Sequence, residues 1–209
     1  MQILFDVLRQ YHYGNNEFSQ NHPYLKPKET KPVVPSVLWI GCSDSQVIPH
    51  EVLGLQSGEV LVYQNIANQV RLEDAGFRSI LQYALEELHI KRIIICGHYE
   101  CSGVRLALKA FDQQNEYEYS DNPFSNWVNE IKYLAYRHWS KLHQILDFKM
   151  RCQRLAELNV LAQAQKLYQD DNFMNNQDDV KIIPWIFDQE RYKVVDLSCE
   201  YDRQLITIV

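Results

Sequence analysis

The sequence lacks several features that would point to common classes of partner. It has no run of lysine or arginine long enough to follow a phosphate backbone, and its net charge is −6, so nucleic-acid binding is not expected. No apolar run reaches the length of a membrane span. The first 20 residues lack the basic start and continuous apolar stretch of a signal peptide. We therefore expect a cytoplasmic protein that binds neither nucleic acid nor membrane.

The number and the spacing of the cysteines are informative. The five cysteines stand at irregular spacing, and their odd number argues against a disulfide framework. In a chain without a signal peptide we expect reduced thiols, some of them free to bind metal. The chain has 209 residues, 46% of them hydrophobic, which predicts a single α/β domain spanning residues 1–209.

Short apolar runs predict the strands of a central sheet. Continuous runs rich in β-branched residues suit a parallel sheet that is covered on both faces. Helical periodicity over residues 74–88, 125–146 and 150–168 separates these runs. The alternation predicts an α/β fold with a mostly parallel central sheet flanked by helices. The predicted strands are residues 37–42, 60–66, 92–97, 181–187 and a weaker edge strand at 192–197.

Residues 1–35 are predicted to form an N-terminal arm and connector. Residues 1–20 have the pattern of an amphipathic helix, and a connector containing Pro27, Pro32 and Pro35 follows it. An apolar helix ahead of the first strand needs a surface to pack against. We therefore expect the chain to form an oligomer.

Zinc-type ligands stand at the ends of two predicted strands. Cys42 ends the first strand and His98 ends the third, while Asp44 lies in a turn and Cys101 at a helix start. Ligands of an open parallel sheet collect at the carboxyl ends of its strands, and a helix start favours a thiolate. Zinc accepts thiolate and imidazole in tetrahedral geometry. Cys42, His98 and Cys101 supply three positions, and the fourth can be water, which makes a catalytic site, or Asp44, which closes it.

These residues and their surroundings resemble the β-class carbonic anhydrase family, whose pattern is Cys-x-Asp-x-Arg followed by His-x-x-Cys. The resemblance implies Zn²⁺ bound by Cys42, His98 and Cys101, with Asp44 as a catalytic carboxylate that assists the zinc-bound water or ligates the metal. It also implies reversible hydration of carbon dioxide to bicarbonate, in a homodimer or homotetramer. The similar segments cover nearly the whole chain and include residues 38–45, 65–70 and 93–98, and, as in bacterial members, 126–127 and 157–160.

Four positions depart from the family pattern, and the one at residue 64 departs from the bacterial members in particular. Gln46 replaces the arginine of the motif, Gln64 replaces a second arginine, Val33 replaces a glutamine, and Ser102 replaces a glycine. An arginine beside Asp44 would hold the carboxylate in a planar, two-pronged ion pair. Glutamine is neutral and donates only through one amide group. We therefore expect Asp44 to close the zinc site for much of the time.

More than one function remains open at this point. The first is a working zinc lyase that hydrates carbon dioxide. The second is a catalytically inactive zinc-binding homologue with a structural or regulatory role in an oligomer, which the changes at Val33, Gln46 and Gln64 favour. A third is a related hydrolase of carbon disulfide or carbonyl sulfide. Arg71 and Arg78 are candidates to replace the missing arginine, because they follow the segment 65–70.

Overall fold

The structure is a computed structural model that describes residues 33–114, 122–170 and 179–200. The chain from Val34 onward forms one compact unit. The predicted N-terminal arm lies outside the described residues, apart from its last three. The single domain over the whole chain therefore stays a prediction.

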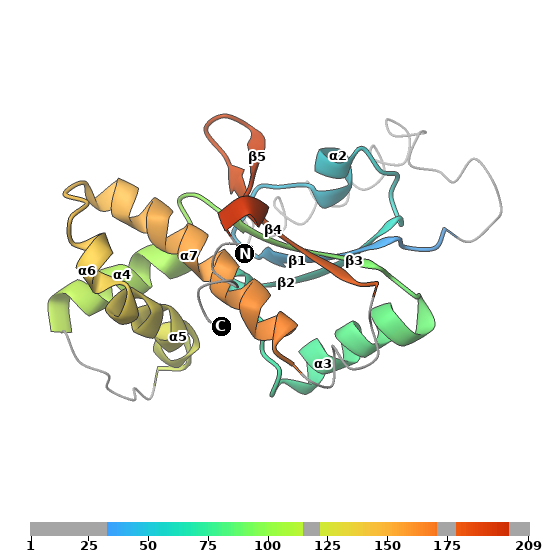
Figure 1. Ribbon diagram of the computed structural model, residues 1–209, viewed down its shortest axis with the longest axis horizontal. Coiled ribbons are helices and arrows are strands. Elements are labelled where there is room, and N and C mark those ends of the chain that lie inside the picture. Colours follow the sequence, from blue (N-terminus) through green and yellow to red (C-terminus); the bar gives the residue numbers. More distant parts are fainter. Residues whose placement is uncertain (1–32, 115–121, 171–178, 201–209) are drawn as a thin grey trace, which may run out of the picture. The chain divides into compact units, whose positions relative to one another are not determined.

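A five-stranded sheet forms the centre of this unit (Figure 1). The strand order is β2-β1-β3-β4-β5, and neighbouring strands are parallel except for the antiparallel pair of β4 and β5. The predicted fold class, an α/β fold with a mostly parallel sheet, is confirmed. The strands are β1 (Val37–Cys42), β2 (Val60–Asn65), β3 (Arg92–His98), β4 (Lys181–Asp188) and β5 (Lys193–Asp196).

Strand β1 lies between two apolar layers, which explains its continuous apolar sequence. All six of its residues are buried. Leu38 and Ile40 belong to the larger core, whereas Trp39 belongs to a smaller cluster with Val47 and Phe187. Because successive side chains of a strand point to opposite faces, β1 contributes to the packing on both sides of the sheet.

The helices are mostly where periodicity predicts them. The predicted helix at 74–88 is present as α3 followed by a π-helical segment, η3, and Asp74 caps its start by accepting a hydrogen bond from the Phe77 N–H. The predicted helix at 125–146 is interrupted at His138, whose backbone is not helical. The elements are α2 (Pro49–Leu53), η2 (Ile66–Asn68), α3 (Ala75–Gln82), η3 (Tyr83–Glu87), α4 (Ser102–Gln114), α5 (Pro123–Arg137), α6 (Trp139–Leu142) and α7 (Phe148–Tyr168).

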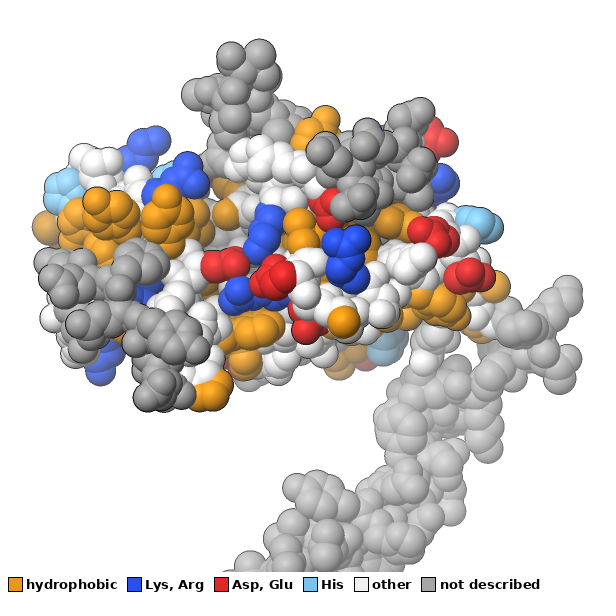
Figure 2. All heavy atoms as spheres, turned by 90° about the horizontal axis from the view of Figure 1, so that it is seen from below, with side chains coloured by type: hydrophobic (Ala, Val, Ile, Leu, Met, Phe, Trp, Pro, Cys, Tyr) orange, Lys and Arg blue, Asp and Glu red, His pale blue; other side chains and the backbone are white. Residues whose placement is uncertain are grey.

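The surface carries charges of both signs. Lysine and arginine side chains lie among aspartate and glutamate side chains on the face that Figure 2 shows, with apolar side chains between them. No helix of the described residues is both long and apolar enough to cross a membrane.

Gly97 allows α7 to pack closely on β3, just ahead of His98. A Cβ at Gly97 would lie 2.6 Å from Val160 Cγ2 and 3.1 Å from Ile186 Cδ1. Overpacking of a core costs about 1–3 kcal/mol, so Gly97→Ala is expected to lower the free energy of unfolding by about that amount. Gly76→Ala, in the exposed first turn of α3, is the control and should change it by less than about 1 kcal/mol. The stability changes of both variants are measured from urea unfolding midpoints. An unchanged midpoint for Gly97→Ala would contradict the tight contact.

Candidate metal centre

The four predicted metal ligands come together at the carboxyl ends of β1 and β3. These strands are parallel neighbours, so Cys42 and His98, their last residues, lie at the same edge of the sheet. The turn after β1 brings Asp44 to this edge, and Cys101 immediately precedes α4. Their ligand atoms all lie within 4.8 Å of one another.

Asp44 points into the cluster. Its Oδ1 lies 2.8 Å from His98 Nε2 and 2.7 Å from Cys42 Sγ. The Ser102 N–H, in the first turn of α4, donates to the other carboxylate oxygen at 2.9 Å. The His98 side chain is 1% exposed and that of Asp44 is 30% exposed. Asp44 therefore forms the solvent-facing side of a buried cluster.

The cluster favours the charged forms of Asp44, Cys42 and His98. Burial opposes ionisation of Asp44, but hydrogen bonds from His98, Cys42 and the Ser102 N–H outweigh it and lower the pKa of the carboxyl. A hydrogen bond from Cys101, against the cost of burial, lowers the pKa of the Cys42 thiol to about 6. His98 is buried, which lowers its pKa, but its contacts with Asp44 and Cys42 raise the pKa to about 9.

Cys101 shows why the cluster suits a cation. Its hydrogen bond to Cys42 and its burial raise the pKa of the Cys101 thiol, because a second negative charge would stand beside the first. Two adjacent thiolates are stable only next to a compensating positive charge. A dication provides that charge, and deprotonated thiols are the form that binds metal.

The chemistry of the donors and the distance between the two sulfur atoms fit zinc. Tetrahedral bonds of roughly 2.0–2.3 Å place neighbouring ligand atoms about 3.3–3.8 Å apart. The sulfur atoms of Cys42 and Cys101 are 3.7 Å apart, within this range. The shorter contacts of Asp44 are hydrogen bonds, which an ion between the ligands would replace. Two thiolates, one imidazole and one carboxylate are ligands that zinc accepts.

Among the hydrogen bonds and ion pairs of the described residues, none joins Asp44 to an arginine. Gln46 is exposed, and the contacts of Asp44 are with Cys42, His98, Cys101 and the Ser102 N–H. The two candidates from the sequence are engaged elsewhere. The guanidinium of Arg71 pairs with Glu130 at 2.9 Å and donates to the Trp127 carbonyl, and Arg78 donates to the Leu72 carbonyl.

Several neighbours of the ligands were not predicted from the sequence. The Ala67 N–H donates to Cys42 Sγ at 3.1 Å. His98 Nδ1 lies 3.0 Å from the Tyr99 carbonyl oxygen and 2.7 Å from the Gln189 side-chain amide. Backbone groups leave no mark in a sequence motif, and Gln189 is 91 residues away from His98. These groups surround the ligands and orient them.

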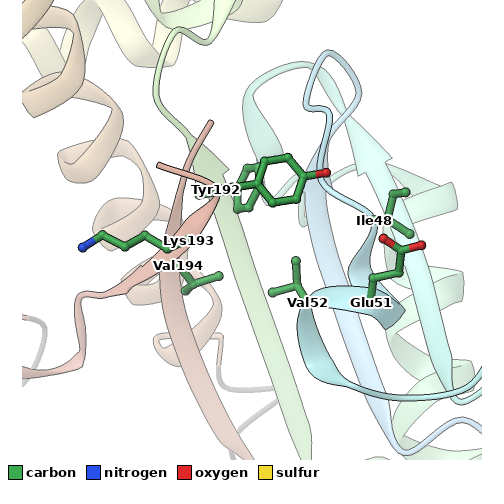
Figure 3. Close-up of a pocket in the computed structure, with 7 residues that line it drawn as sticks. Ile48, Glu51, Val52, Tyr192, Lys193 and Val194 are labelled. Atoms are coloured by element: carbon green, nitrogen blue, oxygen red, sulfur yellow. The ribbon is translucent and has the colours of Figure 1, made fainter. Parts of the chain in front are cut away.

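A hollow of about 430 Å³ lies apart from the ligand cluster. It opens between α2 and the start of β5, where Tyr192 and Val194 face Ile48 and Val52 (Figure 3). None of the four candidate ligands lines it. The ligand cluster is thus not part of the wall of this hollow.

The fold and the ligand cluster define a class of protein. It is an α/β protein whose metal-binding group of two cysteines, one histidine and one aspartate lies at the ends of parallel strands. A family model described as carbonic anhydrase matches residues 37–194. The chain therefore belongs to the carbonic anhydrase family, and its structural neighbours place it in the β class.

Individual relatives agree with this. A carbonic anhydrase of Emericella nidulans is 34% identical over 80% of this chain and 71% of its own length. One of Candida albicans is 32% identical over 64% of this chain, which spans only 45% of that protein. A crystal structure from Sordaria macrospora, one of two tetrameric β-carbonic anhydrases, is 28% identical, covers 95% of this chain and 98% of its own, and has a TM-score of 0.76.

These relatives correct one prediction. The segments at 126–127 and 157–160 led us to expect a bacterial-type member of the family. The three relatives above are fungal, so the prediction of a bacterial-type member is wrong. Motifs of two to four residues are too short to separate branches of one family.

Proposed function

We propose that the chain binds Zn²⁺ through Cys42, Asp44, His98 and Cys101 and catalyses the reversible hydration of carbon dioxide to bicarbonate and a proton. The observation that carries this proposal is the meeting of four ligand atoms within 4.8 Å of one another at the sheet edge. The family supports the reaction. The carboxyl end of the strands is also where α/β folds bind their ligands.

Each side chain has a distinct task in this proposal. Bound zinc supplies Lewis acidity that lowers the pKa of a coordinated water to about 7, which suits attack on carbon dioxide. Cys42, His98 and Cys101 hold the ion from the buried side. Asp44 lies on the exposed side and has two possible roles. It would either orient the coordinated water by accepting its hydrogen bond or take the place of that water as the fourth ligand. The Ser102 N–H donates to the second oxygen of Asp44 and holds the carboxylate at the cluster.

We expect the closed arrangement to prevail near neutral pH. Asp44 Oδ1 already lies among the other three ligand atoms, the Ser102 N–H holds its second oxygen, and Gln46 offers no charge to draw it away. A carboxylate beside a dication binds it unless another cation competes. Activity would therefore be present but lower than in a protein that has the arginine.

Stopped-flow measurement of carbon dioxide hydration tests the reaction. Zinc-loaded protein is expected to accelerate hydration, and removal of zinc with a chelator should abolish the effect, because the water then returns to a pKa of about 15.7. Added Zn²⁺ should restore the rate. Mg²⁺ is the control and should not, since it prefers oxygen ligands in octahedral geometry. Full activity after complete zinc removal would contradict the proposal.

The alternative function is a zinc-binding homologue without catalysis. The inward position of Asp44, together with Gln46, favours it, because a permanently closed site leaves no place for the attacking group. Zinc binding with no hydration at any zinc loading would support this alternative. Hydrolysis of carbon disulfide or carbonyl sulfide, measured on the same samples, tests the third possibility.

We propose a homodimer or homotetramer in the cytoplasm. The Sordaria macrospora structure is that of a tetrameric β-carbonic anhydrase, and Val33 and Val34, at the start of the described chain, expose apolar side chains to solvent. Exposed apolar residues next to a predicted amphipathic arm suit contact with a second copy. Light scattering coupled to size exclusion gives the mass, and a monomer at micromolar concentration would contradict the assembly.

A further inference from the structure

We propose that Asn159 is a positioning residue for the metal ligand Cys42, acting through the backbone of Ala67. This inference rests on the proposed function, because it assumes that Cys42 binds the metal. The two residues are not neighbours in sequence, and α7 brings Asn159 to the turn that follows β2. That turn directs the Ala67 N–H at the Cys42 sulfur.

The turn η2 has an unusual backbone. Ala67 has φ 62° and ψ 32°, and Asn68 has φ 47°. Both are left-handed, a conformation that residues with a Cβ adopt only when the surroundings enforce it. In this conformation the Ala67 N–H points at Cys42 Sγ, 3.1 Å away. The strained turn therefore serves to place a hydrogen-bond donor on the thiolate.

Asn159 holds this turn from the helical side. Its Nδ2 donates to the Ala67 carbonyl oxygen at 2.9 Å. The side chain is buried, with an exposed fraction of 1%, on a helix whose other buried positions are mostly apolar. A buried amide is costly unless it is hydrogen-bonded. Its presence here is explained by the Ala67 carbonyl, which would otherwise be buried without a partner.

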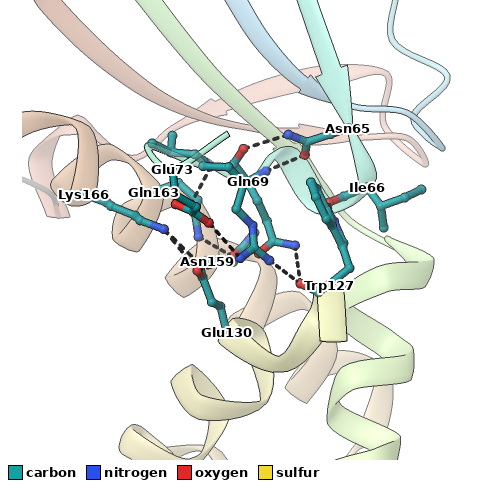
Figure 4. Close-up of polar contacts among 11 residues, drawn as sticks. Asn65, Ile66, Gln69, Glu73, Trp127, Glu130, Asn159, Gln163 and Lys166 are labelled. Atoms are coloured by element: carbon teal, nitrogen blue, oxygen red, sulfur yellow. Dashed lines mark hydrogen bonds and ion pairs between the residues drawn. The ribbon is translucent and has the colours of Figure 1, made fainter. Parts of the chain in front are cut away.

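Gln163 fixes which way the Asn159 amide points. Gln163 Nε2 donates to Asn159 Oδ1 at 3.2 Å, and Gln163 Oε1 accepts from the Val70 N–H at 2.8 Å. Asn159 Oδ1 is thus the acceptor in one bond, and Nδ2 is left to face Ala67. Figure 4 shows Asn159 and Gln163 within the network of amides and charged groups that holds the segment after β2.

The contacts from Asn159 through Ala67 to Cys42 affect metal binding. An N–H that donates to a thiolate stabilises its charged form, which is the form that binds the ion. Groups that orient metal ligands in this way change affinity by about 10- to 100-fold when removed. If Asn159 is lost, the Ala67 carbonyl is released, the left-handed turn relaxes and the N–H leaves the sulfur.

The test compares Asn159→Leu with Leu167→Ala. Leucine has nearly the same shape as asparagine but carries no hydrogen-bond donor, so it cannot donate to the Ala67 carbonyl. Leu167, fully buried eight residues further along α7, is the control for lost stability. We expect Asn159→Leu to weaken zinc binding about 10- to 100-fold, measured by competition with a chelator, and to shift the thiolate-to-metal charge-transfer band of the cobalt-substituted protein. Leu167→Ala should change neither.

The native protein provides a second measurement that needs no variant. In protein loaded with ¹¹³Cd, the Ala67 amide proton is expected to show scalar coupling to the metal through the hydrogen bond to Cys42. Absence of this coupling in the metal-bound protein would overturn the inference. So would an unchanged band and affinity in folded Asn159→Leu, or equal changes in Leu167→Ala. If the native protein binds no metal at all, the proposed function fails instead.

Discussion

Replacing Cys101 with serine is expected to abolish tight zinc binding and to reduce carbon dioxide hydration at least about a thousandfold, because the ion that brings the pKa of water from 15.7 to about 7 is lost. Serine keeps the shape of the side chain but replaces the thiolate with a hydroxyl that stays protonated. The remaining ligands are Cys42, Asp44 and His98, and one of them, Asp44, lies on the exposed side. Metal analysis after dialysis, with stopped-flow hydration, measures both effects.

Cys152→Ser is the matched control for this change. Cys152 is also a buried thiol, and burial raises the pKa of its thiol to about 11, but it lies in α7 outside the ligand cluster. Its replacement should leave zinc content at one ion per chain and hydration unchanged. Retention of zinc and activity in Cys101→Ser would show that the ion, if it is bound, uses a different set of ligands.

Replacing Gln46 with arginine is expected to raise kcat/KM for carbon dioxide hydration near neutral pH by at least about tenfold. A guanidinium can take both oxygens of Asp44 in a two-pronged ion pair. That pair competes with the ion for the carboxylate and leaves the fourth position to water. Zinc content should stay the same, because Cys42, His98 and Cys101 still hold the ion.

Gln46→Lys separates the geometry of the pair from its charge. Lysine adds the same positive charge without the planar fork, so we expect a smaller increase than with arginine. Equal gains in both variants would mean that charge alone matters. No gain in either, with zinc present, would mean that Asp44 does not limit the reaction in the native chain.

The central strands β1 and β3 were predictable because nearly all of their residues are buried. The run Val37–Cys42 matches β1 residue for residue, since a short continuous apolar run that ends at polar residues favours a buried strand. The break at His138 was not predictable, because the segment contains neither proline nor glycine and its apolar period continues. The short helix α2 was missed for a related reason: five residues are too few to show a period.

The metal centre was predictable as far as side chains define it. Cys42 and His98 end strands that pair in parallel, and this alone brings them to one edge. The groups that orient them were not predictable. The Ala67 N–H belongs to the backbone, and Asn159 stands 92 residues further along the chain from the carbonyl it holds. Only the packing of α7 on the sheet brings those groups together.

The central claim is that Asp44 completes a zinc centre formed by Cys42, His98 and Cys101. A crystal structure of the zinc-loaded protein near neutral pH tests it most directly. We predict one zinc ion per chain, bound by two sulfur atoms, one His98 nitrogen and one oxygen of Asp44. Zinc that carries a water in its fourth position, with Asp44 turned away, would contradict the closed site, and zinc bound elsewhere would contradict the whole assignment.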